Sequence, residues 1–174
     1  MACKRIAFID KHVGEDNSDN RMRFDENKKI LERLGELYDV AAYSGLSDGT
    51  CKKLRRDCSS KGPYHGIITH VPGDPKYPER MRRSGERLSD MPQERKAEIC
   101  YGSNIDLIKG LHESFPLSVI VAYTGAGDDI LPDWKLKTHG VSYILRRSSH
   151  IPYWLEERDL EPDLKKIIGW MEGR

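Results

Sequence analysis

The chain has 174 residues, a length that fits one domain with room for an insertion. Its 29 Lys and Arg residues nearly balance its 28 Asp and Glu residues, which argues against a surface that binds nucleic acid throughout. No stretch is apolar and long enough to cross a membrane, and the N-terminal MACKRIAFID lacks the apolar region of a secretory signal. We therefore expect a cytoplasmic protein with a single domain over residues 1–174.

Cysteine and histidine spacing gives little support for a metal site. The four cysteines include no C-x-x-C pair, and CKKLRRDC (51–58) has the wrong spacing for a usual zinc knuckle. No two of the six histidines are four positions apart. The sequence therefore predicts reduced thiols and no metal centre built on histidine.

Apolar runs and amphipathic segments alternate in the first part of the chain. KRIAFID (4–10) is a short apolar run that predicts a buried strand. FDENKKILERLGELY (24–38) places its apolar residues on one helical face, with Asp25 as the expected N-cap. DVAAYSG (39–45) predicts a second strand.

The next segments add a helix, a strand and an insertion. SDGTCKKLRRDCSSKG (47–62) predicts a polar, basic helix, and HGIITHV (65–71) predicts a third strand. Residues 72–98 have almost no apolar periodicity, four prolines and many arginines. We expect this stretch to be an insertion or mobile loop, with room for a short helix.

The remaining segments continue the alternation. GSNIDLIKGLHESF (102–115) predicts a helix that begins with a capping box formed by Ser103 and Asp106. PLSVIVAYTGAG (116–127) is the clearest strand of the chain. The other expected elements are a short helix at 131–140, a strand at 141–147, a connection at 148–159 and a helix at 161–171.

This order predicts an α/β fold. Strands that alternate with helices favour a parallel sheet covered by helices on both faces. About five strands in the order 2-1-3-4-5, with an insertion after the third, make a flavodoxin-like three-layer sandwich. Binding sites in such folds lie beyond the carboxyl ends of the strands.

The strand ends resemble those of response-regulator receiver domains, the CheY-like family. The resemblance lies in IAFIDKH, GIITHVPGD, SVIVAYTGA and GVSYILRRS, and it covers most of the chain outside 72–98. In that family, an acidic pair after the first strand holds Mg²⁺, and an aspartate on the third strand is phosphorylated. A Thr or Ser on the fourth strand contacts the phosphoryl group, and a Lys on the fifth neutralises it.

The chain departs from this pattern at several positions. Asp10 matches the first acid, but Lys11 takes the place of the second. The phosphoacceptor position falls on His70, or on Thr69 if the register shifts by one residue. The remaining matches are Tyr123 at the fourth-strand hydroxyl, with Thr124 next to it, and Arg147 at the lysine.

These departures change the expected chemistry. Mg²⁺ prefers oxygen ligands that include carboxylates, so Asp10 beside the cation of Lys11 makes a poor metal site. An acyl phosphate needs a carboxylate nucleophile, which neither His70 nor Thr69 supplies. We therefore assign no catalytic residue and no cofactor, and Asp10 would be the metal ligand if there were one. The candidate residues for binding a ligand or anion are Lys11, Thr69, Thr124 and Arg147, with Arg146 beside them.

The leading hypothesis is a pseudo-receiver, a non-catalytic signalling module that works through protein–protein contacts. A homodimer is one form that such contacts could take. The resemblance implies a contact face around the fourth and fifth strands and their helices, where Trp134, Tyr143 and Tyr153 lie.

Two alternatives belong to other classes. One is a small α/β enzyme for a phosphorylated or nucleotide ligand, with Asp10 as the acid or Mg²⁺ ligand and His70 as the acid/base. Arg147 would bind the phosphate in that enzyme. The other is a nucleic-acid-associated regulator that uses the basic segments 51–62 and 76–96.

Overall fold

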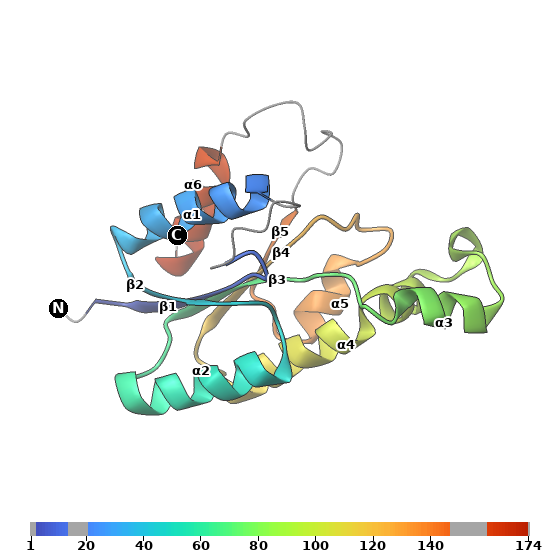
Figure 1. Cartoon of the computed structure of the whole chain (residues 1–174), viewed down its shortest axis with the longest axis horizontal. Helices are drawn as coiled ribbons and strands as arrows, with labels where there is room; N and C mark the ends of the chain where they lie inside the picture. The colour runs from blue at the N-terminus through green and yellow to red at the C-terminus, as the bar shows by residue number, and fades with distance from the viewer. Residues whose placement is uncertain (1–2, 14–20, 147–159, 174) are drawn as a thin grey trace.

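One parallel sheet organises the molecule (Figure 1). The computed structural model describes residues 3–13, 21–146 and 160–173. Its five strands lie in the order β2-β1-β3-β4-β5, which confirms the predicted flavodoxin-like order. The strands are β1 (Arg5–Ile9), β2 (Asp39–Tyr43), β3 (Gly66–His70), β4 (Val119–Thr124) and β5 (Tyr143–Arg146).

Helices cover both faces of this sheet. α1 and α6 lie on one face, α2, α4 and α5 lie on the other, and α3 projects beyond the carboxyl ends of the strands (Figure 1). A short 3₁₀ turn, η2 (Leu88–Asp90), follows α3. The helices are α1 (Arg21–Gly35), α2 (Asp48–Lys61), α3 (Tyr77–Ser84), α4 (Gln93–Ser114), α5 (Asp133–Thr138) and α6 (Glu161–Met171).

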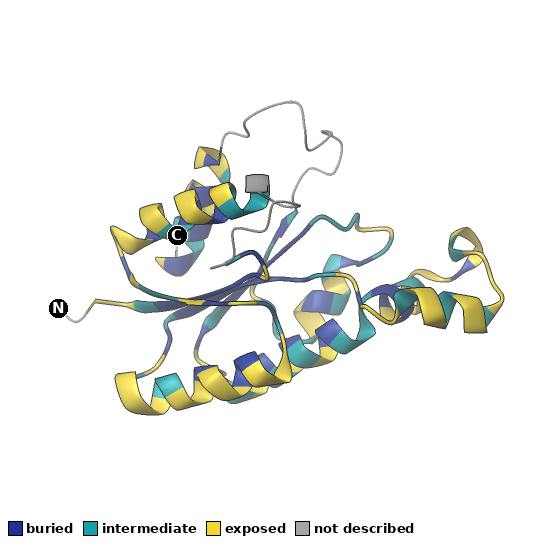
Figure 2. Cartoon of the chain, in the orientation of Figure 1, coloured by how far each residue is buried: buried dark blue, intermediate teal, exposed yellow. Residues whose placement is uncertain are grey.

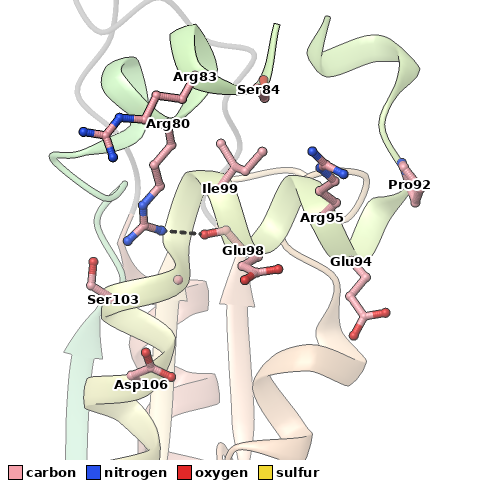
Figure 3. Close-up of a pocket in the computed structure, with 11 residues that line it drawn as sticks. Arg80, Arg83, Ser84, Pro92, Glu94, Arg95, Glu98, Ile99, Ser103 and Asp106 are labelled. Carbon is pink, nitrogen blue, oxygen red and sulfur yellow. Dashed lines mark hydrogen bonds between the residues drawn. The ribbon is translucent and has the colours of Figure 1, made fainter. Parts of the chain in front are cut away.

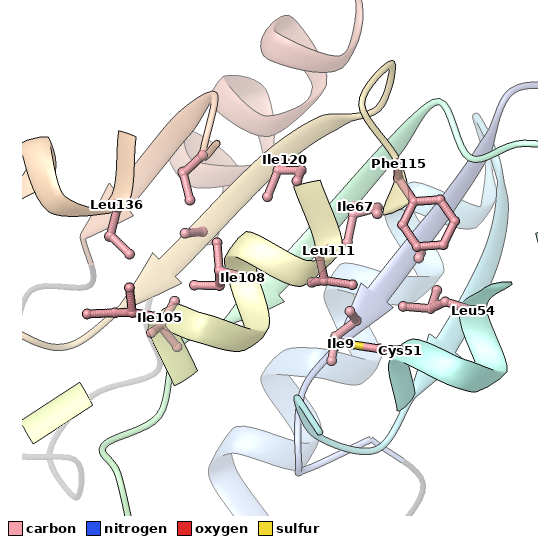
Figure 4. Packing of buried hydrophobic residues seen from close by; sticks show 14 of the residues in the cluster. Ile9, Cys51, Leu54, Ile67, Ile105, Ile108, Leu111, Phe115, Ile120 and Leu136 are labelled. Carbon is pink, nitrogen blue, oxygen red and sulfur yellow. The ribbon is translucent and has the colours of Figure 1, made fainter. Parts of the chain in front are cut away.

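The alternation of side chains along each strand separates two apolar cores. Phe8 and Ile68 face α1 and α6, whereas Ile9 and Ile67 face α2 and α4. Figure 4 shows the second of these cores, and Figure 2 shows that the central strands are buried on both sides. Two-sided burial explains why these strands are continuous apolar runs in the sequence.

The C-terminal helix packs closely against the sheet. At Gly66, the first residue of β3, an added Cβ atom would lie 2.1 Å from Met171 Sδ of α6. The neighbouring His65 ring nitrogen Nε2 lies 2.6 Å from the Met171 carbonyl oxygen. The absence of a side chain at Gly66 therefore allows α6 to approach the central strand.

Two predicted helix starts are wrong. α1 begins at Arg21, so Asp25 lies inside the helix and is not its N-cap. α4 begins at Gln93, so Ser103 and Asp106 lie in its middle and form no capping box. The N-terminal half of α4 is helical because Ala97, Ile99 and Cys100 are buried, a stripe too short to stand out in a charged sequence.

The insertion at 72–98 contains more helix than the sequence suggests. It holds α3, η2 and the beginning of α4. α3 buries none of its residues, which fits the lack of apolar periodicity. The predicted connection at 148–159 lies outside the described residues, and so does Tyr153. Within the described ranges, no helix is both long and apolar enough to cross a membrane.

Candidate functional site at the strand ends

Three side chains form a row at the carboxyl ends of neighbouring strands. His70 is paired with Tyr123 across β3 and β4, and Ile9 is paired with Thr69 across β1 and β3. Asp10, the residue after Ile9, is therefore level with His70. Because side chains alternate along a strand, Asp10, His70 and Tyr123 all face the α1 and α6 side. We call these three residues the strand-end row.

Tyr123 connects the members of the strand-end row. Its hydroxyl donates a hydrogen bond to Asp10 Oδ2, and its ring centroid lies 5.2 Å from that of His70. On the core side, the same ring stacks on Phe8 with a centroid distance of 5.9 Å. The phenol thus spans β3 and reaches the carboxylate that follows β1.

Hydrogen bonds hold the Asp10 carboxylate in place inside the protein. Asp10 is only 1% exposed, and its Oδ1 accepts a hydrogen bond of 2.8 Å from the His12 backbone N–H. Its Oδ2 accepts the bond from Tyr123, which is itself 2% exposed. A buried carboxylate needs such donors because burial without them is costly.

The two candidate threonines lie on the other side of the sheet. Thr69 and Thr124 alternate with His70 and Tyr123, so their side chains face α2 and α4. The Thr69 hydroxyl donates to the His70 carbonyl at 3.3 Å. Thr124 Oγ1 accepts from the Ala126 N–H at 3.1 Å. The structure therefore brings Asp10 and His70 together but directs both threonine hydroxyls to nearby backbone.

The basic candidate residues do not gather at the strand-end row in the described part of the chain. Lys11 is exposed in the turn after β1, and Arg147 lies outside the described residues. Arg146 ends β5 and donates to the carbonyl oxygens of Ala126 at 2.6 Å and Leu131 at 2.7 Å. It also forms ion pairs with Asp128 and Asp133. Arg146 thus organises the β4–α5 loop, and these acids already neutralise its charge.

The strand-end row does not fit a magnesium ion. It supplies one carboxylate, and both oxygens of that carboxylate accept hydrogen bonds. Mg²⁺ requires near-octahedral oxygen coordination, and the strand-end row offers it a single carboxylate. Among the described residues, no three His, Cys, Asp or Glu side chains gather to hold any metal ion.

Comparison with solved structures shows which fold this is. A CheY-like response regulator receiver domain from Methanospirillum hungatei JF-1 is 16% identical, with a TM-score of 0.51, 99% of this chain covered and 98% of that chain. A response regulator from Thermotoga maritima is 13% identical, with a TM-score of 0.56 and coverages of 98% and 99%. The fold is that of a CheY-like receiver domain.

Other comparisons agree or are silent. A LuxR-family two-component response regulator from Aurantimonas sp. SI85-9A1 is 16% identical, with a TM-score of 0.53, 99% of this chain covered and 88% of that chain. No protein-family model and no curated protein matches the chain. At these identities the likeness establishes the receiver fold alone.

Asp74 is an acid of this receiver-like chain that the sequence analysis did not single out. It lies between β3 and α3, and its carboxylate is fully buried. Its Oδ2 accepts hydrogen bonds from the Ser103 hydroxyl and, at 3.1 Å, from the Ser103 N–H. Arg80 lies 3.2 Å from the same oxygen, and the Lys76 N–H donates to Oδ1 at 2.9 Å.

These contacts determine the ionisation of Asp74 and its role. Burial raises the pKa of Asp74, but the hydrogen bonds from Ser103 and Lys76, together with the Arg80 charge, outweigh burial and lower the pKa. The ionised side chain fastens the end of β3 to the middle of α4. Sequence alone gave no signal for this anchor, because Ser103 lies 29 positions away.

Proposed function

We propose that the chain is a receiver-like signalling module that accepts no phosphoryl group and acts through protein–protein contacts. The observation that supports this most directly is the hydrogen bond from the Tyr123 hydroxyl to Asp10 across His70. The phenol ring of Tyr123 occupies the position where the family resemblance implies a small residue with a hydroxyl group. The Tyr123 hydroxyl also donates to Asp10, the carboxylate that the resemblance assigns to Mg²⁺ binding.

Binding of Mg²⁺ at Asp10 would be energetically costly. To bind Mg²⁺, Asp10 would have to give up the Tyr123 hydrogen bond, and such a bond to a charged group contributes about 1.5–3 kcal/mol. A neighbouring carboxylate would be needed to compensate, and His70 stands where the resemblance implies one. An unaltered hydrogen-bond network is therefore the low-energy state of the strand-end row.

The face around α5, β5 and α6 offers a surface for the proposed contacts. Trp134 on α5 is 48% exposed, which is unusual for so large an apolar side chain. Tyr143 on β5 stacks on Trp170 of α6 with a centroid distance of 4.9 Å and parallel rings. Partly exposed aromatic residues are enriched in protein interfaces, so a protein partner or a second copy of the chain would bind here.

A titration with Mg²⁺ and beryllofluoride tests the proposal. One of the similar solved structures is a BeF₃-activated receiver domain, DrrB, so the reagent suits this fold. We expect no change in the backbone NMR signals of Asp10, His70 and Tyr123. The matched variant Lys11→Asp/His70→Asp/Tyr123→Thr restores a carboxylate pair, a third-strand carboxylate and a small hydroxyl, and it should respond at these positions.

Two outcomes would argue against the proposal. Signal changes centred on Asp10 in the unaltered protein would mean that the site takes a metal and a phosphoryl mimic. They would favour the alternative of a small enzyme for a phosphorylated ligand, which draws on the closeness of Asp10 and His70. Hydrolysis of p-nitrophenyl phosphate that is lost in His70→Gln would identify that enzyme.

A further inference from the structure

A large open groove lies between α3 and α4. Its volume is about 820 Å³, and it is lined by residues of the insertion and of α4, not by the strand-end row. Figure 3 shows Arg80 and Arg83 of α3 above the surface of α4 that carries Glu98 and Ile99. We call this feature the α3–α4 groove.

The spacing of residues on α4 gives the groove its acidic wall. Glu94, Glu98, Gly102 and Asp106 recur at every fourth position, so they follow one side of the helix. Gly102 leaves a gap in this wall, and an added Cβ atom there would lie 2.9 Å from Arg80 Nη1. Arg80 Nη1 also donates to the Glu98 carbonyl oxygen at 2.9 Å (Figure 3). The Arg80 guanidinium thus lies over the gap.

The positive charges of the groove are already compensated. Each of its arginines forms an ion pair with an acid, and Glu94 pairs with a lysine of α5. These pairs are Arg80–Asp74 at 3.2 Å, Arg95–Glu86 at 3.2 Å, Arg83–Glu79, and Glu94–Lys135 at 3.7 Å. An incoming phosphate would therefore have to compete with carboxylates that are part of the same chain.

Two carboxylates remain. Glu98 and Asp106 are exposed, and neither side chain forms an ion pair or hydrogen bond with another residue in the described part of the chain. They lie eight positions apart on one helix, which corresponds to about 12 Å along its axis. The unmet charge of the α3–α4 groove is negative, so it suits a cationic occupant.

We propose that the α3–α4 groove binds a basic segment of a partner protein, with two Arg or Lys side chains spaced to reach Glu98 and Asp106. Pro92, which is exposed at the start of α4, provides apolar surface for the methylene stem of such a side chain. The groove belongs to the part of the molecule that projects farthest beyond the strand ends, where a protein-sized partner has access (Figure 1). This inference rests on the proposed protein-contact function and names the chemistry of one partner.

Binding of a small peptide measures this directly. The probe is a fluorescein-labelled, end-capped seven-residue Gly/Ser peptide with arginines at its second and sixth positions, which span about 13 Å when extended. Its control has the same composition, with arginines at the second and third positions. We expect saturable binding in the millimolar range at low salt. The control peptide should bind about fivefold more weakly, because each exposed ion pair adds up to about fivefold in affinity.

Substitutions in α4 test whether the peptide binds at the α3–α4 groove. Glu98→Gln/Asp106→Asn removes both unmatched carboxylates at exposed positions and should weaken the peptide about tenfold. Glu113→Gln is the matched control, since it removes an exposed carboxylate of the same helix outside the groove. It should change the affinity by less than about twofold. Unchanged thermal unfolding of each variant shows that the fold is intact.

Four results would overturn the inference. They are no saturable binding, equal binding of the two peptides, an equal loss in Glu113→Gln, and displacement of the peptide by spermidine at a lower concentration than by unlabelled peptide. The last would indicate a polyamine site instead. The two proposals can fail separately. If the peptide does not bind and the NMR signals of the strand-end row do not change with Mg²⁺ and beryllofluoride, the groove assignment is wrong while the signalling proposal is still supported.

Discussion

Tyr123 combines two functions in one side chain. Its ring belongs to the core shared by α1 and α6, while its hydroxyl serves Asp10 at the strand ends. A Thr or Ser at this position could provide a hydroxyl but not the reach across β3. The hydrogen bonding of Asp10 at the candidate site therefore depends on a residue that is also part of the apolar core.

We expect Tyr123→Phe to destabilise the protein by about 1–3 kcal/mol in urea unfolding, because Asp10 would lose a buried donor. Tyr143→Phe is the control, since the Tyr143 hydroxyl makes no hydrogen bond with a described residue and the ring stack on Trp170 is retained. Equal unfolding midpoints for Tyr123→Phe and the unaltered protein would contradict the importance of this hydrogen bond.

At the scale of elements, Asp74 joins the insertion to the receiver-like body. Its N–H donates to the Cys100 carbonyl at 2.6 Å, and Asn104 donates from its side chain to the Pro72 carbonyl at 2.9 Å. The β3–α3 connection is therefore bonded along its length to the middle of α4. This explains how a helix without buried residues, α3, is held in a defined position.

Asp74→Asn should cost about 2–3 kcal/mol of stability near pH 7, because it removes a buried charge that Arg80 and Ser103 surround. The lowered pKa of Asp74 means that the carboxylate stabilises the fold above its ordinary pKa and loses this effect as the pH falls through the folded value. The difference between variant and unaltered protein should therefore shrink below about pH 4. A penalty that grows at low pH would refute this account.

Asp106→Asn is the control for that measurement. It changes an exposed carboxylate of the same helix that has no ion pair with a described residue. Urea unfolding should differ from that of the unaltered protein by less than about 0.5 kcal/mol at any pH.

For the whole molecule, the part of the insertion before α4, residues 72–92, adds no residue to the two apolar cores. Both apolar cores lie on the sheet between the helices, and α3 contributes no buried residue to either. The segment can therefore be cut without exposing the sheet, although α4 must stay in place because Ala97 and Ile99 are buried.

Limited trypsin digestion should cleave after Arg82, Arg83 or Arg87 before it cleaves within any strand, since these arginines are exposed. The nicked protein should retain its circular dichroism spectrum and elute as one species. Loss of structure at the same rate as the first cut would show that the insertion is required for the fold.

The sequence was sufficient for the sheet but not for the contacts between distant segments. Strands such as β3 and β4 are short apolar runs, and their alternation with helices predicts the observed order. The same alternation places Asp10, His70 and Tyr123 on one side, but it does not reveal that a phenol reaches a carboxylate 113 positions away. The start of α4 was missed because a short buried stripe is hidden among charged residues.

Gly66 has a consequence for how substitutions are tolerated. Glycine ordinarily weakens a strand, so sequence rules favour replacing it with Val or Ile. Here Met171 Sδ occupies the space that any Cβ atom would need. A side chain at position 66 therefore requires the flexible thioether of Met171 to move, and such a substitution should be tolerated better when Met171 is replaced by a smaller residue.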